Sequence, residues 1–355
     1  MVDIEALVDA EIEKGSFPGI VLLVEKADNL LYSLVKGFRQ YHPARERMSA
    51  DTLFDLGSIT KPLSTALLTL KVCEQEHILL ERKIRDFIPE IAPESGEITL
   101  LQLLLHTGGL PPDPYIYREF PDPLHIDHER AVRKLLAIVP DRPPGTELIY
   151  SCTGYLLLGR FLERVTGIRL EKLFQRMVAD SCRIDDLFFN PQGPSRRRAA
   201  ATEFCSWRKR WMRGEVHDEN CCCLGGDAGN AGLFGTARSV LELLSVFTSE
   251  GSVKGVQLLS PSGVRQMSSC LTQGMSSRRS IGFLMQDERS PAGPKFSQSS
   301  FGHTGFTGTS IWIEPEKQLK IITLTNRVHL GREATDLKIK EFRRKIHSAI
   351  HQNWE

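Results

Sequence analysis

Two strand-turn-strand patterns lie at opposite ends of this 355-residue chain, and their separation constrains the fold more than any other feature. Near the N-terminus, residues 19–37 read GIVLLVEKADNLLYSLVKG, two runs of strand-forming residues around a polar turn. Near the C-terminus, residues 309–326 read TSIWIEPEKQLKIITLTN, with a turn at residues 315–318. Residues 279–286, RSIGFLMQ, predict a further strand. The chain ends are therefore expected to be rich in β-structure.

The chain between the hairpins carries mostly helical patterns, in which apolar residues recur every three or four positions. A capping box from Thr99 to Gln102 and the pair Gly108-Gly109 are typical of a helix start and stop. Helices are expected at residues 3–14, in the run after Ser58, at 99–107, at 128–140, at 153–167 and from about Arg332 onward.

These patterns favour an α/β (α+β) fold. One antiparallel sheet is built from both chain ends and flanked by the terminal helices, and a mostly helical domain is inserted between them. We expect residues 1–57 and 235–355 to form the sheet domain and residues 58–234 the helical domain. A ligand cleft is expected where the two domains meet.

Composition excludes several classes of function. The 45 Lys and Arg residues nearly cancel the 44 Asp and Glu residues, so the chain has no overall field to hold nucleic acid or an anionic membrane. No apolar stretch reaches the roughly 18 residues of a membrane span, and the N-terminus lacks a signal-peptide profile. The eight cysteines form no CxxC pair, which indicates free thiols. A cytoplasmic protein with a small-molecule partner is expected, or a periplasmic one if a leader has been removed. The oligomeric state is not predicted.

Ser58 and Lys61, in the segment FDLGSITK, have the spacing of a nucleophile and its base. Residues three apart on a helix share a face, so the amine can reach the hydroxyl. Gly57 permits a tight turn before the serine, whereas Pro62 distorts the helix if it lies beyond the first turn. A serine at this position is also a common helix cap, and the pair alone leaves both interpretations open.

Two other Ser-x-x-Lys pairs serve as comparisons. Ser33 and Lys36 lie in a predicted strand, where side chains three apart face opposite sides of the sheet. Ser206 and Lys209 lie in a basic, aromatic stretch that is typical of a solvated surface. Neither pair predicts catalysis.

Five motifs occur in an order and spacing that resemble those of the penicillin-recognising serine hydrolases. They are FDLGSITK at 54–61, LLLHTGGLP at 103–111, YSC at 150–152, GDAGNAGLFGTA at 226–237 and GHTGFTGTSIWIEP at 302–315. More narrowly, the chain resembles the class C β-lactamase-like group, which includes DD-peptidases, low-molecular-weight penicillin-binding proteins and family VIII carboxylesterases. The resemblance covers nearly the whole chain and implies a β-lactamase/transpeptidase-like fold with no cofactor or metal.

The resemblance also implies roles for matching residues. Ser58 would be the acylated nucleophile and Lys61 the base or a neighbour that shifts pKa values. Tyr150 would relay the proton to the leaving group and activate the deacylating water. The backbone N–H groups of Ser58 and Phe306 would form the oxyanion hole, in which each donor is typically worth about 10² to 10³ in rate.

The substrate-binding residues implied by the resemblance are Cys152, His303, Thr304, Gly305 and Arg332. Cys152 stands where amide-cleaving relatives commonly have Asn, and a thiol offers neither the acceptor nor the donors of an amide. His303 replaces a lysine, which makes any charge there dependent on pH. Arg327 or Arg332 could supply a carboxylate anchor instead.

We therefore expect an esterase-like hydrolase of small acyl substrates, with a β-lactamase or D-Ala-D-Ala carboxypeptidase as the alternative. The partner would be an ester, a β-lactam or a D-amino-acyl compound.

Two rival interpretations stay open. A metallohydrolase could use His125 and His128 with Asp122, Asp127 or His106, although the chain has no His-Glu-x-x-His helix. A protein of the same fold could also bind penicillins without turnover and act as a sensor or scaffold. The proline-rich loop at residues 110–125 is a candidate lid over the site.

Overall fold

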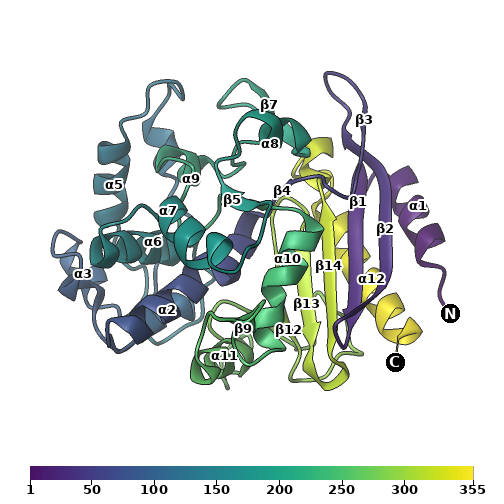
Figure 1. The fold of residues 1–355 in the computed structure, drawn as a ribbon. Helices are drawn as coiled ribbons and strands as arrows, with labels where there is room; N and C mark the ends of the chain where they lie inside the picture. The colour runs from purple at the N-terminus through teal and green to yellow at the C-terminus, as the bar shows by residue number, and fades with distance from the viewer. Residues whose placement is uncertain (355) are drawn as a thin grey trace.

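A single antiparallel sheet joins the two ends of the chain in the computed structural model, which describes residues 1–354 (Figure 1). Its seven strands lie in the order β11-β12-β13-β14-β1-β2-β3. Their bounds are β1 Gly19–Lys26, β2 Asn29–Gln40, β3 Glu46–Arg47, β11 Leu284–Met285, β12 Phe301–Thr304, β13 Ser310–Glu314 and β14 Leu319–Thr325. β1 pairs with β14, so that Leu22 lies opposite Thr323. The expected fold class and both predicted hairpins are confirmed.

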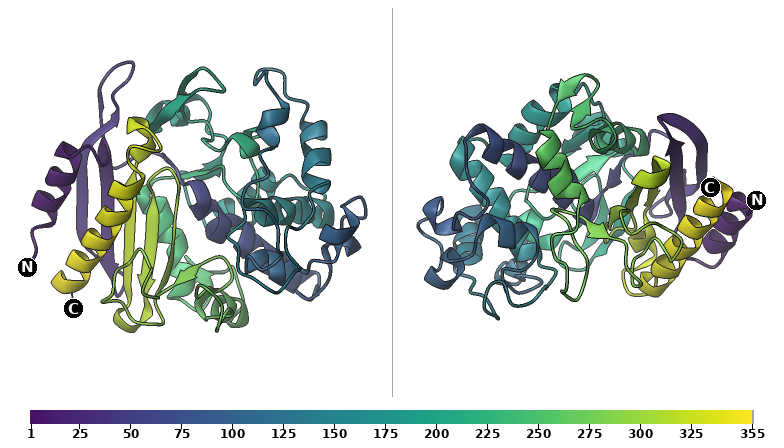
Figure 2. Two further views of the ribbon diagram at one scale, coloured as in Figure 1. Left: turned by 180° about the vertical axis from the view of Figure 1, so that it is seen from behind. Right: turned by 90° about the horizontal axis from the view of Figure 1, so that it is seen from below.

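The central strands are buried on both faces, which explains why they read as continuous apolar runs. Ile20 and Leu22 of β1 pack in one cluster with Trp312, while Val21 and Leu23 point to the opposite face and join the main core. Helices α1 (Ile4–Glu13) and α12 (Asp336–Asn353) cover the first face (Figure 2). Helix α10 (Ala237–Leu244) packs against β1 and β14 on the other face.

Helices α2, α4, α5 and α7 pack around α6 beside the sheet (Figure 1). The bounds of the helices in the middle of the chain are α2 Leu67–Gln75, α3 Pro93–Gly96, α4 Leu100–Leu104, α5 His128–Leu136, α6 Cys152–Thr166, α7 Leu170–Phe174, α8 Gly193–Arg198, α9 Glu219–Cys223 and α11 Pro261–Ser268. The capping box between Thr99 and Gln102 is present at the start of α4. The division into domains at residues 57/58 and 234/235 stays a prediction.

Three smaller sheets connect these parts. β4 (Phe54–Asp55), β8 (Leu233–Gly235) and β5 (Leu187–Phe189) form one of them, and its strand β4 leads directly into the turn that holds Ser58. The others pair β6 (Ala201–Cys205) with β7 (Arg210–Arg213), and β9 (Ser252–Val253) with β10 (Val256–Gln257).

Two expected elements differ in the structure. The strand predicted over residues 279–286 is reduced to β11, because Gly282 has a φ of +85° and interrupts the extended backbone. The last helix begins at Asp336 rather than near Arg332, after a short 3₁₀ turn at Arg327–Leu330. None of the helices within residues 1–354 is both long enough and apolar enough to cross a bilayer.

Candidate active site

Ser58 lies in a single 3₁₀ turn, Gly57–Ile59, between β4 and the helical part of the chain. Gly57 has a φ of +54°, and its N–H donates to Asp55 Oδ1 at 2.8 Å, which fixes the turn. A Cβ atom on Gly57 would lie 3.2 Å from the backbone nitrogen of Phe306. Glycine therefore allows the nucleophile turn and the end of β12 to approach each other closely.

Lys61 begins a π-helical turn, Lys61–Ala66, in which Pro62 removes one N–H from the helical hydrogen-bond ladder. Its side chain is fully buried. The Lys61 Nζ donates to Ser58 Oγ at 3.0 Å and to the backbone oxygen of Asn230 at 3.1 Å. The pair predicted from local spacing thus makes a hydrogen bond.

Tyr150 and Cys152 reach the same lysine from the start of α6. Ser151 caps this helix by accepting from the Gly154 N–H, which places its two neighbours at the helix N-terminus. Cys152 Sγ lies 3.5 Å from Lys61 Nζ, and the Tyr150 ring centre lies 5.0 Å from the same nitrogen. The structure therefore brings together the hydroxyl, the amine, the thiol and the phenol ring.

The charge on Lys61 depends on these neighbours. Burial by itself lowers the pKa of Lys61, but negative charge on Cys152 or Tyr150 raises it, and the balance raises the pKa above its usual value. Burial raises the pKa of the Cys152 thiol. Burial therefore favours a neutral thiol at Cys152, which leaves negative charge on Tyr150 as the influence that would keep Lys61 protonated.

The end of β12 is tied to the nucleophile turn by two hydroxyl groups. Thr307 Oγ1 donates to the backbone oxygen of Asp55 at 2.7 Å, and Thr309 Oγ1 donates to that of Leu56 at 2.9 Å. A Cβ atom on Gly305 would meet the Leu56 oxygen at 2.4 Å, so this position has room only for glycine. These contacts hold the Phe306 N–H near Ser58, where the oxyanion hole was expected.

His303 and Thr304 lie in β12 beside the same site, but His303 carries no charge near neutral pH. Its ring is buried and Nδ1 lies 2.9 Å from the backbone oxygen of Thr304, so Nδ1 bears the proton. Burial, with further contributions from Lys61 and Arg279, lowers the pKa of His303 well below its usual value. The Nε2 atom is buried without a partner.

Arg279 and His106 also surround Tyr150; Arg279 was not predicted as a site residue, and His106 was considered only as a ligand in the metallohydrolase interpretation. The Arg279 guanidinium lies 5.2 Å from the Tyr150 ring centre, and its Nε and Nη1 atoms are buried without hydrogen-bond partners. The His106 ring lies 4.6 Å from that of Tyr150, and its Nδ1 accepts from the Ser151 N–H at 3.1 Å. Arg279 follows Arg278 in the polar segment SSRRS at residues 276–280, which gives no sequence signal for a buried site residue.

Two cavities meet at Ser58, Tyr150 and Phe306. One, of about 240 Å³, lies on the side of α9 and is lined by Cys152, Arg332 and several acidic residues. The other, of about 430 Å³, lies on the side of β12 and α12. Its charged lining residues are Arg279, Arg327, Arg343, Lys340 and Asp336.

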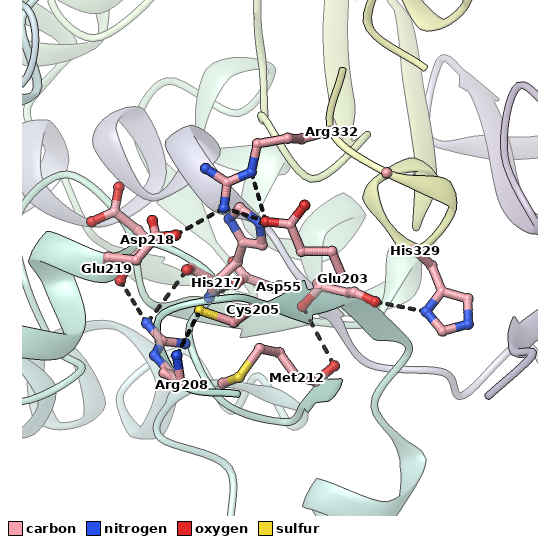
Figure 3. Close-up of polar contacts among 12 residues, drawn as sticks. Asp55, Glu203, Cys205, Arg208, Met212, His217, Asp218, Glu219, His329 and Arg332 are labelled. Carbon is pink, nitrogen blue, oxygen red and sulfur yellow. Dashed lines mark hydrogen bonds and ion pairs between the residues drawn. The ribbon is translucent and has the colours of Figure 1, made fainter. Parts of the chain in front are cut away.

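Arg332 lines the first cavity, but its positive charge is already paired with carboxylates of the protein. The guanidinium donates to Glu203 Oε1 and to Glu219 Oε1 (Figure 3). These two carboxylates raise the pKa of Arg332 against the opposing effect of burial. Arg327, the other anchor considered, is buried and donates to the Arg332 oxygen and Thr335 Oγ1.

The histidines of the metallohydrolase interpretation are engaged separately. His125 pairs with Asp122 at 2.7 Å, whereas His128 Nδ1 contacts the backbone oxygen of Cys223 at 2.8 Å. Asp127 caps α5 by accepting from the Arg130 N–H. Across residues 1–354 no three His, Cys, Asp or Glu side chains gather as metal ligands would. This arrangement gives the metallohydrolase no structural support.

The loop considered as a lid is tied down along its length. Asn220 Nδ2 donates to Asp113 Oδ1 at 2.8 Å, and Trp207 Nε1 donates to the backbone oxygen of Phe120 at 2.7 Å. Asp113 of this loop lines the first cavity, so the loop contributes to the cavity wall.

Comparison with known proteins agrees with this geometry. The chain is 28% identical to an N-acetylmuramyl-L-alanine amidase of Bacillus subtilis (strain 168), over 92% of this chain and 80% of the relative. It is 25% identical to a protein of Escherichia coli (strain K12) provisionally named D-alanyl-D-alanine carboxypeptidase, over 91% of this chain and 81% of that protein. Both relatives are known or named as hydrolases.

Solved structures share the fold. EstCE1, described as a hydrolase with promiscuous acyltransferase activity, superposes with a TM-score of 0.73 at 22% identity, covering 96% of this chain and 97% of that chain. A penicillin-binding protein homologue from Caulobacter crescentus gives a TM-score of 0.70 at 19% identity, covering 94% and 98%. The profile of the β-lactamase family matches residues 4–343. The chain therefore belongs to the β-lactamase family of serine hydrolases.

Proposed function

We propose that Ser58 attacks an ester or amide carbonyl and forms an acyl-enzyme. Lys61 and Tyr150 are the proposed groups that control the transfer of the Ser58 hydroxyl proton. The observation that carries this proposal is the 3.0 Å hydrogen bond from Lys61 Nζ to Ser58 Oγ at the meeting point of two cavities. A serine hydroxyl needs an adjacent group to remove its proton before it is an effective nucleophile.

Tyr150, as a phenolate beside the Lys61 ammonium, is the proposed proton acceptor, since negative charge on Tyr150 is one of the influences that raise the pKa of Lys61. In acylation the Ser58 Oγ–C bond forms, the Ser58 proton passes to the Tyr150 oxygen and then to the leaving group, and the scissile bond breaks. In deacylation Tyr150 takes a proton from water, whose oxygen attacks the acyl carbon; the bond from that carbon to Ser58 Oγ breaks, and the proton passes from Tyr150 to Ser58 Oγ as the acid leaves. Lys61 stays charged and orients the Ser58 hydroxyl throughout.

The backbone N–H groups of Ser58 and Phe306 are the proposed oxyanion hole. Phe306 N lies at the close approach between β12 and Gly57, and Thr307 and Thr309 fix that approach. Such preorganised donors stabilise the negative charge that develops on the carbonyl oxygen.

Esters are the favoured substrates, because the thiol of Cys152 cannot present the amide group that an asparagine would offer an acylamino substrate. A carboxylate-bearing leaving group, as in a D-Ala-D-Ala peptide, is a second candidate supported by a separate observation. Arg279 is 6% exposed, lines the second cavity with Ser58, and has two nitrogen atoms without partners. A buried guanidinium with unpaired N–H groups favours a carboxylate ligand. The curated relatives include a carboxypeptidase by name.

The test compares wild type with Ser58→Ala on three substrates: a chromogenic short-chain ester, a chromogenic cephalosporin and a D-Ala-D-Ala peptide. Loss of the nucleophile is expected to lower kcat/KM on the preferred substrate by at least 10³-fold. Ser206→Ala is the matched control, since Ser206 belongs to an exposed Ser-x-x-Lys pair outside the site. Ester turnover within a few-fold of wild type in Ser58→Ala would contradict the assignment.

Intact-mass measurement after mixing with a fluorophosphonate or a penicillin separates turnover from sensing. An enzyme is expected to show a penicillin adduct that decays, or none, together with a stable fluorophosphonate adduct on Ser58. A permanent penicillin adduct without turnover of any of the three substrates would favour a sensor.

A further inference from the structure

The first cavity, beside Ser58, is lined by carboxylates from two different segments. Asp113 comes from the loop that follows α4, and Asp218 and Glu219 come from the N-terminal end of α9. Asp55 lies at its base. These groups share the cavity with the reacting hydroxyl, so any acyl group bound there lies among them.

The cavity is short of positive charge. Arg332 is its one guanidinium, and it already pairs with Glu219 and with Glu203, which also accepts from His217 Nε2 at 2.8 Å (Figure 3). Nearby Arg208 donates to backbone oxygens, including that of Val216 at 2.7 Å. Within residues 1–354, neither Asp113 nor Asp218 has a cationic side chain at ion-pair distance.

Asp113 and Asp218 instead accept neutral N–H groups. Asp218 Oδ1 accepts from the Cys221 N–H at 2.7 Å, and Asp113 Oδ1 accepts from the Tyr115 N–H at 2.9 Å. Burial and the nearby negative charges of Glu219 and Asp113 raise the pKa of Asp218 against the opposing Cys221 hydrogen bond. Asp218 also acts at longer range on Lys61, whose pKa it helps to raise. The cluster is therefore held in place without a cation in contact with Asp113 or Asp218.

The side-chain oxygens of two buried asparagines next to these carboxylates accept no hydrogen bond. Asn220 Nδ2 bonds to Asp113, and Asn230 Nδ2 bonds to Asp218 Oδ2 at 3.1 Å. The Oδ1 atom of each asparagine is buried with no hydrogen-bond partner, and the two side chains are 2% and 1% exposed. Unsatisfied buried acceptors are uncommon and call for an explanation. Neither asparagine lines the cavity itself; their amide nitrogens hold the carboxylates of Asp113 and Asp218.

The second cavity has the opposite character. Arg279 and Arg343 line it with unpartnered nitrogen atoms, and Asp336 is its one carboxylate. Ser58 thus lies between a negative and a positive cavity. A substrate that spans both is complementary if its two ends carry opposite charges.

We propose that the acid-lined cavity binds a protonated amine on the acyl group of the substrate, so that the natural substrate is zwitterionic, with its carboxylate on the leaving group. This rests on the proposed function of Ser58 and names the substrate class of the same site. Asp113 and Asp218 supply the charge that selects the amine.

The test uses D-lactate esters, which keep a carboxylate on the leaving group. D-Alanyl-D-lactate and 5-aminopentanoyl-D-lactate are compared with N-acetyl-D-alanyl-D-lactate and hexanoyl-D-lactate, in which the amine is blocked or replaced by a methyl group. We expect at least a 10-fold higher kcat/KM for one or both amines over their neutral partners in wild type. The preference should fall at least three-fold in Asp113→Asn and in Asp218→Asn, which keep an acceptor oxygen and lose the charge.

Asp122→Asn is the matched control, because Asp122 lies on the same loop with an exposed side chain outside the cavity. It should leave the preference unchanged. Equal rates for charged and neutral acyl groups in wild type, or a preference that survives in both cavity variants, would overturn the inference. Turnover of the neutral esters shows that a variant is folded and that Ser58 acts as proposed. Failure of wild type to hydrolyse any ester would instead contradict the proposed function itself.

Discussion

Cys152 Sγ lies 3.5 Å from Lys61 Nζ and lines the first cavity, where the acyl group of the proposed substrate would bind. A neutral thiol is a weak hydrogen-bonding group, so it holds Lys61 less firmly than an amide oxygen would. The backbone oxygen of Asn230 provides the firmer contact, at 3.1 Å. The site can therefore keep its lysine in place without an asparagine at position 152.

Replacing this thiol should change the choice between esters and amides. Cys152→Asn supplies an acceptor for Lys61 and two donors for a substrate amide. We expect it to raise the ratio of kcat/KM on a D-Ala-D-Ala peptide to kcat/KM on a short-chain ester, by about 3- to 10-fold, as one or two hydrogen bonds imply. Steady-state kinetics of both substrates measure the ratio. Cys270→Asn, at a partly exposed thiol outside both cavities, is the control. An unchanged or lower ratio in Cys152→Asn would show that the thiol does not limit amide cleavage.

At the scale of residues, the sequence predicted the parts of the site that depend on short spacing. Ser58 and Lys61 are three residues apart, and Gly57 needs the positive φ that the motif suggested. Arg279 could not be found in this way, because its importance comes from burial beside Tyr150, 129 positions earlier in the chain. The neutral state of His303 likewise depends on burial and on Lys61, which spacing does not reveal.

At the scale of elements, the π-helical turn at Lys61–Ala66 determines where the side chain of Lys61 points. Gly282 packs directly against this turn, so that a Cβ atom there would lie 3.1 Å from Pro62 Cα and 3.1 Å from Ala66 Cβ. Gly282 has a φ of +85°, a conformation that disfavours any side chain. The segment before β11 thus supports the lysine turn from outside.

Gly282→Ala should therefore affect both stability and catalysis. We expect a loss of about 2 to 4 kcal/mol in the free energy of unfolding, from the unfavourable φ and the crowding together. Movement of the turn should also lower kcat. Gly255→Ala is the matched control, because Gly255 has a φ of +82° with nothing near its Cβ position, and it should cost only about 1 to 2 kcal/mol. Denaturant unfolding and ester kinetics measure the two effects. Equal losses in the two variants would mean that contact with the turn contributes nothing.

The same glycine shows why some elements were mispredicted. Periodicity identified both hairpins and the long helices, since those patterns extend over many residues. It could not show that residues 279–286 leave the extended conformation at Gly282, or that the chain makes a 3₁₀ turn at Arg327–Leu330 before α12. Buried side chains such as Arg327, which bonds to Thr335 Oγ1, fix these local departures from a distance.

At the scale of the whole molecule, burial of histidines links folding to pH. His347 of α12 is fully buried between that helix and the sheet, and burial lowers its pKa to about 4, although its contact with the Pro291 oxygen opposes the shift. The unfolded chain binds a proton at this residue below about pH 6.5, while the folded chain does not until about pH 4. Stability therefore falls as the pH decreases through this range.

His347→Gln should remove this contribution. We expect the free energy of unfolding of wild type to fall more steeply than that of His347→Gln between pH 6.5 and 4, by up to roughly 1.4 kcal/mol per pH unit. Denaturant unfolding at several pH values gives both slopes. His125→Gln, at a side chain that is 83% exposed, should keep the wild-type slope. Parallel curves for wild type and His347→Gln would contradict this account.

The pairing of β1 with β14 has a consequence for the order in which the protein matures on the ribosome. Residues near 20 find their partners only when residues near 320 have been synthesised, so the central sheet cannot close on a nascent chain that stops short of them. Ser58 leaves the exit tunnel long before Phe306 does. A nascent chain that stops before residue 306 therefore carries the proposed nucleophile without its second proposed oxyanion donor, and the proposed hydrolysis must await synthesis of the C-terminal hairpin.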